Sequence, residues 1–104
     1  MTWQELAGEL QALGYPVVYH SFKEPKAPPF ITIAYVNNND LIADNFNYKD
    51  IGNYQVELYT KNKNTAVEQE VESVLKSNKL AYSKLEFSLE SENLRQIVYE
   101  LNII

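Results

Sequence analysis

The side chains that most often perform chemistry in proteins are sparse in this sequence. It contains no Cys and a single His, His20, and Arg95 is the only Arg. A catalytic His needs a nucleophile and an orienting carboxylate that converge on it, and nothing around His20 in the sequence supplies them. We therefore expect His20 to lie at the surface or to pack in a sheet, and we expect no enzymatic activity.

One acidic segment has residue types that could bind a hard cation. Asp40, Asp44 and Asp50 lie close to three consecutive Asn residues at positions 37–39, and calcium prefers clustered oxygen ligands. However, the spacing lacks the Asp-x-Asn-x-Asp-Gly order and the closing Glu of a calcium-binding loop. Asn and Asp are also common in turns. The sequence therefore predicts turns here, with no bound metal and no cofactor.

A second acidic group lies in a segment that is predicted to be a helix. Glu68 and Glu72 are four residues apart and share a helix face, whereas Glu70 points in another direction. Acidic side chains near a helix N-terminus interact favourably with the helix dipole. We expect these residues to act in helix solubility and dipole pairing rather than in catalysis.

Composition limits the classes of partner. The chain has 104 residues, a net charge of −5 and a hydrophobic fraction of 45%, which is typical of one globular domain spanning residues 1–104. A surplus of acidic residues argues against specific nucleic-acid binding, which normally needs a basic face. No apolar run approaches the roughly 20 residues that cross a bilayer, so no membrane partner is expected.

Two helices are predicted from apolar spacing and N-terminal capping. Residues 2–13 have a Thr2–Glu5 capping box, and residues 65–77 have a similar Thr65–Glu68 pair. Gly14 is expected to end the first helix with a left-handed backbone conformation. Each helix has an apolar stripe at three- and four-residue spacing, formed by Trp3, Leu6, Leu10 and Leu13 in the first and by Val67, Val71, Val74 and Leu75 in the second.

The remaining segments predict strands. Residues 17–22, 30–36, 41–48 and 54–60 precede the second helix, and two more strands follow it, with residues 91–93 as their hairpin connection. The expected fold is α+β: an antiparallel or mixed β-sheet with two helices packed on one face, in the order α-β-β-β-β-α-β-β. Because residues 30–36 are apolar on both faces, we expect an interior strand whose second face packs on a helix or on a partner chain.

Tyr is the richest surface signal, with eight residues in the chain. Tyr is enriched at protein interfaces because it buries apolar area at low entropic cost, although half-buried sheet positions also explain it. The residues expected at a subunit interface come from strand 30–36 and from the end of strand 54–60. They are Phe30, Thr32, Ile33, Tyr35 and Tyr59.

The order of these pieces is similar to a known protein family. A short helix that begins at Trp3 is followed by Tyr15-Pro16-Val17-Val18-Tyr19, by Pro28-Pro29-Phe30-Ile31, and by residues 54–60 directly before a Glu-rich helix. This pattern resembles the tail-terminator, or tail-completion, proteins of tailed bacteriophages and prophages, of the lambda type. The resemblance covers nearly the whole chain and rests on packing and turn patterns rather than on a chemical motif.

The resemblance implies a non-enzymatic virion component. Such proteins form a ring, usually six-fold, that stops polymerisation of the tail tube and offers a docking face to the head. The implied partners are further copies of the chain, six on the tail, together with the major tail protein and the head connector protein. The implied location is the virion, with assembly in the host cytoplasm. A neighbouring head–tail joining protein would fit the same pattern.

Two other function classes stay open at this point. An antiparallel sheet with two helices also fits a small ferredoxin-like domain that binds a ligand or regulates another protein, and such a domain would need a pocket with convergent polar groups. An enzyme has the least support, because the sequence shows no nucleophile, base or metal set.

Overall fold

The computed structural model describes residues 1–21, 26–38, 41–43, 46–49 and 51–103. Two α-helices and seven strands are present in these residues, which confirms the α+β class. In chain order the elements are α1 (Trp3–Gln11), β1 (Val17–Tyr19), β2 (Phe30–Asn38), β3 (Leu41–Ala43), β4 (Phe46–Lys49), β5 (Gly52–Thr60), α2 (Thr65–Ser77), β6 (Tyr82–Leu89), the short 3₁₀-helix η1 (Glu90–Glu92) and β7 (Leu94–Ile103).

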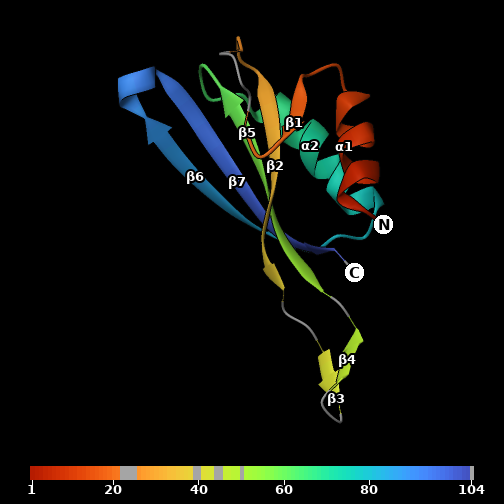
Figure 1. Cartoon of the computed structure of the whole chain (residues 1–104). Coiled ribbons are helices and arrows are strands. Elements are labelled where there is room, and N and C mark those ends of the chain that lie inside the picture. Colours follow the sequence, from red (N-terminus) through yellow and green to blue (C-terminus); the bar gives the residue numbers. More distant parts are fainter. Residues whose placement is uncertain (22–25, 39–40, 44–45, 50, 104) are drawn as a thin grey trace.

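Five strands form a mixed sheet in the order β1-β2-β5-β7-β6. β1 is parallel to β2, and every other neighbouring pair is antiparallel. Both helices lie on the same side of this sheet (Figure 1). β3 and β4 pair with each other and form an arm that extends away from the sheet beyond β2 and β5 (Figure 1), so the molecule measures 50 × 27 × 23 Å.

The core lies between the helices and one face of the sheet. Strand residues alternate between the two faces, and the buried set comes from alternate positions of each central strand together with the apolar stripes of the helices. Its fully buried members from the helices are Leu6, Leu10, Val71 and Leu75, and those from the strands are Ile31, Ile33, Val56, Leu58, Ile97 and Tyr99.

The two helix N-termini differ in how they are capped. In α1 the predicted capping box is present: the Glu5 backbone N–H donates to Thr2 Oγ1 at 3.1 Å, and the Thr2 backbone N–H donates to Glu5 Oε1 at 3.0 Å. Gly14 has φ +102° as expected. The capping box predicted for α2 is wrong, because Asn64 takes the cap position one residue earlier and its Oδ1 accepts from the Val67 N–H at 3.2 Å.

Three predicted strand boundaries need correction. The strand expected over residues 41–48 is two strands, β3 and β4, which pair as a hairpin. The strand expected over residues 17–22 ends at Tyr19, because His20 has φ +72° and leaves the extended conformation. Of the turn expected at residues 37–40, Asn37 and Asn38 belong to β2 instead, and residues 39–40 lie outside the described part of the chain.

The acidic side chains of α2 form a polar cluster with β6. Glu68 is 3% exposed and its Oε1 lies 2.8 Å from Lys84 Nζ, while Lys63 Nζ lies 2.9 Å from Glu68 Oε2. Lys84 Nζ also lies 2.8 Å from Glu72 Oε2, which accepts a hydrogen bond of 2.8 Å from the Tyr99 hydroxyl. The expectation that these carboxylates mainly serve helix solubility is therefore corrected: they tie α2 to the sheet.

Electrostatics within this cluster favours the charged forms of Lys84 and Glu72. Hydrogen bonds to Glu68 and Glu72 raise the pKa of Lys84 above its ordinary value. Burial alone would raise the pKa of Glu72, but the hydrogen bonds from Lys84 and Tyr99 outweigh it and hold that pKa below its ordinary value. A carboxylate that is easier to ionise in the folded state than in the unfolded state stabilises the fold once it is charged.

We predict that acid weakens the attachment of α2 to the sheet. Since the folded-state pKa of Glu72 is lowered, its contribution is present above the ordinary value of 4.5 and is lost as the pH falls through the folded-state pKa. The free energies of unfolding of the wild type and of Glu72→Gln, measured with urea, should therefore differ at neutral pH. This difference should shrink as the solution is acidified below pH 4.5. A difference that grows with acidification would contradict this assignment.

We also predict a sharp contrast between two leucines. Leu10 is fully buried in the core, whereas Leu85 is 44% exposed on β6. Leu10→Ala should lower the free energy of unfolding by about 2–5 kcal/mol because it leaves a cavity. Leu85→Ala should cost less than about 1 kcal/mol. If urea denaturation shows equal losses of unfolding free energy for the two variants, Leu85 belongs to the core.

Candidate functional site

The sheet face opposite the helices is the candidate site. On this face, side chains that are paired across β2, β5, β7 and β6 form three rows, and we call the three rows together the open face. The aromatic row is Phe30, Tyr59, Gln96 and Phe87; the Glu57 row is Thr32, Glu57, Val98 and Leu85; and the Glu100 row is Ala34, Gln55, Glu100 and Ser83.

Apolar side chains concentrate in the first two of these rows. The aromatic rings of Phe30 and Tyr59 stack with centroids 4.7 Å apart. Val98 is 5% exposed although it lies outside the core between the helices and the sheet. Beside it on the edge strand β6, Leu85 and Phe87 are 44% and 47% exposed. Large exposed apolar side chains that adjoin one another are a feature of interaction surfaces.

A carboxylate is held in place within this apolar region. Glu57 Oε2 accepts hydrogen bonds from the Tyr59 hydroxyl at 2.8 Å and from Thr32 Oγ1 at 3.1 Å. Gln96 Nε2 in turn donates to the Tyr59 hydroxyl oxygen at 2.9 Å. Burial, and then the hydrogen bond to Glu57, raise the pKa of Tyr59 to about 12. This chain of hydrogen bonds fixes the orientation of Glu57 before any partner arrives.

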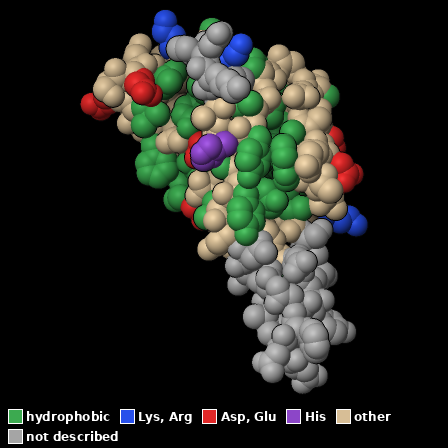
Figure 2. Space-filling view, in the orientation of Figure 1, with side chains coloured by type: hydrophobic (Ala, Val, Ile, Leu, Met, Phe, Trp, Pro, Cys, Tyr) green, Lys and Arg blue, Asp and Glu red, His purple; other side chains and the backbone are tan. Residues whose placement is uncertain are grey.

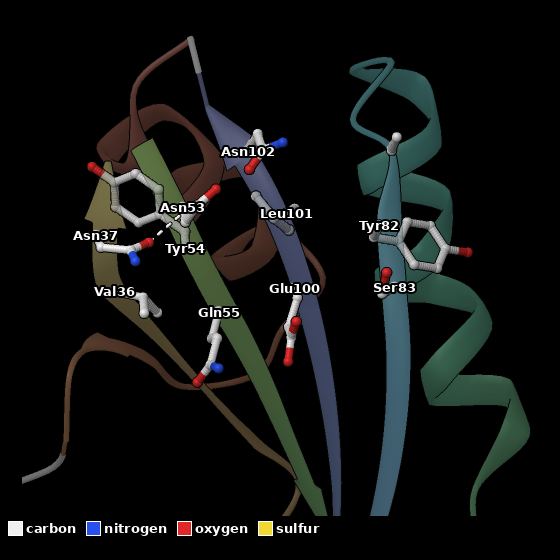
Figure 3. Close-up of a pocket in the computed structure, with 11 residues that line it drawn as sticks. Val36, Asn37, Asn53, Tyr54, Gln55, Tyr82, Ser83, Glu100, Leu101 and Asn102 are labelled. Atoms are coloured by element: carbon white, nitrogen blue, oxygen red, sulfur yellow. Dashed lines mark hydrogen bonds between the residues drawn. The ribbon is translucent and has the colours of Figure 1, made fainter. Parts of the chain in front are cut away.

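The other end of the face is polar and concave. A pocket of about 610 Å³ lies there, and Gln55, Glu100 and Ser83 lie side by side in it on β5, β7 and β6 (Figure 3). Next to them Asn53 Nδ2 donates to Asn37 Oδ1 at 2.6 Å (Figure 3). The described residues of the lining include no Lys, Arg, His or Cys. The pocket therefore offers amide and carboxylate groups to a polar partner but no pair of groups suited to acid–base chemistry.

A second aromatic group lies on the helix side, where the arm begins. The rings of Trp3 and Tyr19 have centroids 4.4 Å apart, and those of Tyr35 and Tyr54 meet edge to face at 5.5 Å. A Cβ on Gly52 would come within 2.7 Å of the Tyr54 ring, so this glycine makes room for Tyr54. Figure 2 shows hydrophobic side chains gathered on this surface beside the single His.

The predicted interface residues are divided between the two faces. Phe30, Thr32 and Tyr59 lie on the open face, whereas Ile33 and Tyr35 lie on the helix side. Ile33 is fully buried in the core and Thr32 is 4% exposed, so neither side chain is available at the surface of this chain. The division between the two faces follows from strand alternation, which places consecutive residues of β2 on opposite faces.

The residues that sequence reasoning missed are Glu57, Leu85 and Phe87. Leu85 and Phe87 alternate with Lys84 and Glu86 in β6, a pattern that normally marks the apolar side as the buried one. In the structure the charged side faces α2 instead. The signal that could have revealed this is the pair of carboxylates on one face of α2, which requires cationic partners from another element.

The described residues show no group of three or more His, Cys, Asp or Glu side chains that could hold a metal ion. His20 follows β1 and is exposed. Asp40, Asp44 and Asp50, which were considered as cation ligands, lie outside the residues for which side chains are described. Within the described part of the chain, no helix is long and apolar enough to span a membrane.

We predict that Glu57 contributes measurably to the ionisation of Tyr59. Glu57→Gln removes a negative charge beside the hydroxyl, so the pKa of Tyr59 should fall from about 12 toward its ordinary value of 10.0. It should stay above that value because burial is the largest cause of the rise. NMR titration of the ¹³C-labelled Tyr ring carbons measures this. An unchanged pKa would mean that Glu57 is not held against Tyr59.

The comparisons with known proteins support the fold. No protein-family model matches the sequence, and no curated protein matches it. Among solved structures, the chain is similar to a protein in the virion of a native gene transfer agent particle, with a TM-score of 0.64 and 12% sequence identity. The match covers 93% of this chain and 81% of the other. At this identity the likeness is one of fold, and it extends over nearly the whole chain.

Proposed function

We propose that the protein is a non-enzymatic structural component of a phage-like virion, and that it acts as a tail terminator or head–tail joining protein. The observation that carries this proposal is the whole-chain similarity to a protein of a gene transfer agent virion. The sequence resemblance to tail terminators points in the same direction independently of that structural match. Both lines concern the complete arrangement of elements rather than one motif.

The surface features fit a protein that works through contacts. The open face presents Leu85 and Phe87 to solvent together with the oriented carboxylate of Glu57. Among the described residues, the pocket at its other end contains no acid–base pair. A closed ring built from one kind of subunit needs two different complementary patches on each copy, and an open sheet face can serve as one of them.

In this proposal the chain assembles as a ring, with six copies on the tail, between the major tail protein and the head connector protein. It would act in the virion after assembly in the host cytoplasm. The net charge of −5 suits a ring through which DNA passes without binding. Phe30, Tyr35 and Tyr59 keep their proposed place at subunit contacts, since each reaches or borders the surface.

A ferredoxin-like ligand-binding or regulatory domain is the alternative. The observation in its favour is the unit β5–α2–β6, in which β5 and β6 are each antiparallel to β7 and so run parallel to each other with β7 between them. The pocket of about 610 Å³ offers a place for a ligand. The structural match to a virion protein favours the first proposal.

We predict that loss of the gene gives tails of abnormal length or tails that do not join heads. The measurement is electron microscopy of particles from a phage or prophage that carries the deletion, with the wild-type gene supplied in trans as a control. Normal tails that carry heads would contradict the terminator proposal and would favour the ligand-binding alternative.

A point variant tests whether the open face carries this function. Phe87→Glu places a charge on an exposed aromatic position, so it should reproduce the deletion phenotype while the unfolding curve of the monomer stays near that of the wild type. Gln69→Glu adds the same charge at an exposed position of α2 and is the matched control. If both variants assemble normally, the open face is not needed for assembly.

A further inference from the structure

The open face is one-sided in charge. Its three rows contain the carboxylates of Glu57 and Glu100 and no Lys or Arg. Among the described residues, Glu57 accepts hydrogen bonds from Thr32 and Tyr59 through Oε2, and Glu100 is exposed at the edge of the polar pocket. A surface of this kind, with apolar side chains around oriented carboxylates, is complementary to a partner that presents basic side chains.

The same chain carries a basic patch on its other layer. Lys76 lies in the last turn of α2 and Lys79 follows that helix, and both are exposed. Among the described residues neither forms an ion pair, in contrast to Lys63 and Lys84, which are held by carboxylates. Asn78, between the two lysines, donates from its Nδ2 to Glu9 Oε1 at 3.2 Å. This end of α2 therefore keeps two lysines free for a partner.

We propose that the open face of one copy binds the C-terminal end of α2 of the next copy, with Lys76 and Lys79 facing Glu57 and Glu100. This inference deepens the proposed ring function and rests on it. The two patches lie on opposite layers of the molecule, because α2 covers the face of the sheet that the open face does not (Figure 1). A contact between unlike patches runs head to tail, and it forms a ring when the rotation from copy to copy closes.

The apolar part of the open face gives this contact its area. Leu85 and Phe87 would be covered by the neighbouring copy, and burial of apolar surface is the main favourable term in protein association. The charges then decide orientation and partner more than they decide affinity. Lys61 is a poorer candidate than Lys76, because it directly follows β5 and so lies beside the open face of its own copy rather than on a second patch.

Disulfide trapping tests the contact directly, because the chain contains no Cys. The test variant combines Gln55→Cys, which lies between Glu57 and Glu100 on the open face, with Ser77→Cys beside the two lysines. These positions are on opposite layers, so one copy cannot close the bond on itself. Oxidation at high protein concentration should give a ladder of covalent oligomers that ends in a closed species.

Matched controls separate this contact from chance collisions. Ser21→Cys with Ser77→Cys places the first thiol at an exposed position after β1, and it should give no ladder. Gln55→Cys alone should stay monomeric. A dimer from Gln55→Cys alone would show that two open faces meet each other and would overturn the proposal, as would a ladder that is equally strong in the Ser21 control.

Charge exchange gives a second readout. In the trapping variant, Glu100→Lys should lower the cross-linked fraction about fivefold, the scale expected for reversing an exposed ion pair. Adding Lys79→Glu should restore it. If the cross-linked fraction does not recover in the protein with both exchanges, Lys79 does not pair with Glu100. If disulfide trapping succeeds while the gene deletion leaves tails normal, the proposed virion role is wrong but the contact is supported. If the deletion phenotype appears and trapping gives no oligomers, only the proposed contact is wrong.

Discussion

The structure depends on how α2 is joined to the sheet. Burying Tyr99 against α2 brings its hydroxyl to Glu72, and the same carboxylate meets Lys84 from the edge strand β6. Three elements are thereby fixed by one polar cluster at the boundary of an apolar core. Burying such charges is costly unless each has partners, and here Glu68 is buried with two lysines around it. The side of β6 that bears the charges must consequently face the helix.

That orientation has a direct consequence for the other face. Since Lys84 and Glu86 are turned toward α2, the alternating residues Leu85 and Phe87 are turned outward. The exposed apolar surface is thus not a defect of packing but the necessary counterpart of the ionic attachment. The same strand holds the helix with one set of side chains and presents a contact surface with the other.

Sequence patterns predicted the elements well where a local rule applied. The Thr2–Glu5 cap, the apolar stripes and the interior position of β2 all follow from local spacing. The patterns failed where the answer depended on partners distant in the chain. Asn64 displaced Thr65 as the cap of α2, Ile33 proved to be core, and the outward side of β6 was set by carboxylates on α2. Such long-range choices are visible only after the elements are packed together.

The distribution of charge argues for contact between unlike surfaces rather than like ones. If two open faces met through a two-fold axis, Glu57 and Glu100 of both copies would be brought together without a Lys or Arg in the three rows to compensate them. Like charges placed opposite one another at an interface cost several kcal/mol, on the order of a thousandfold in affinity. A surface that repels its own copy but matches another patch of the same chain favours head-to-tail growth, which is the geometry that a closed ring requires.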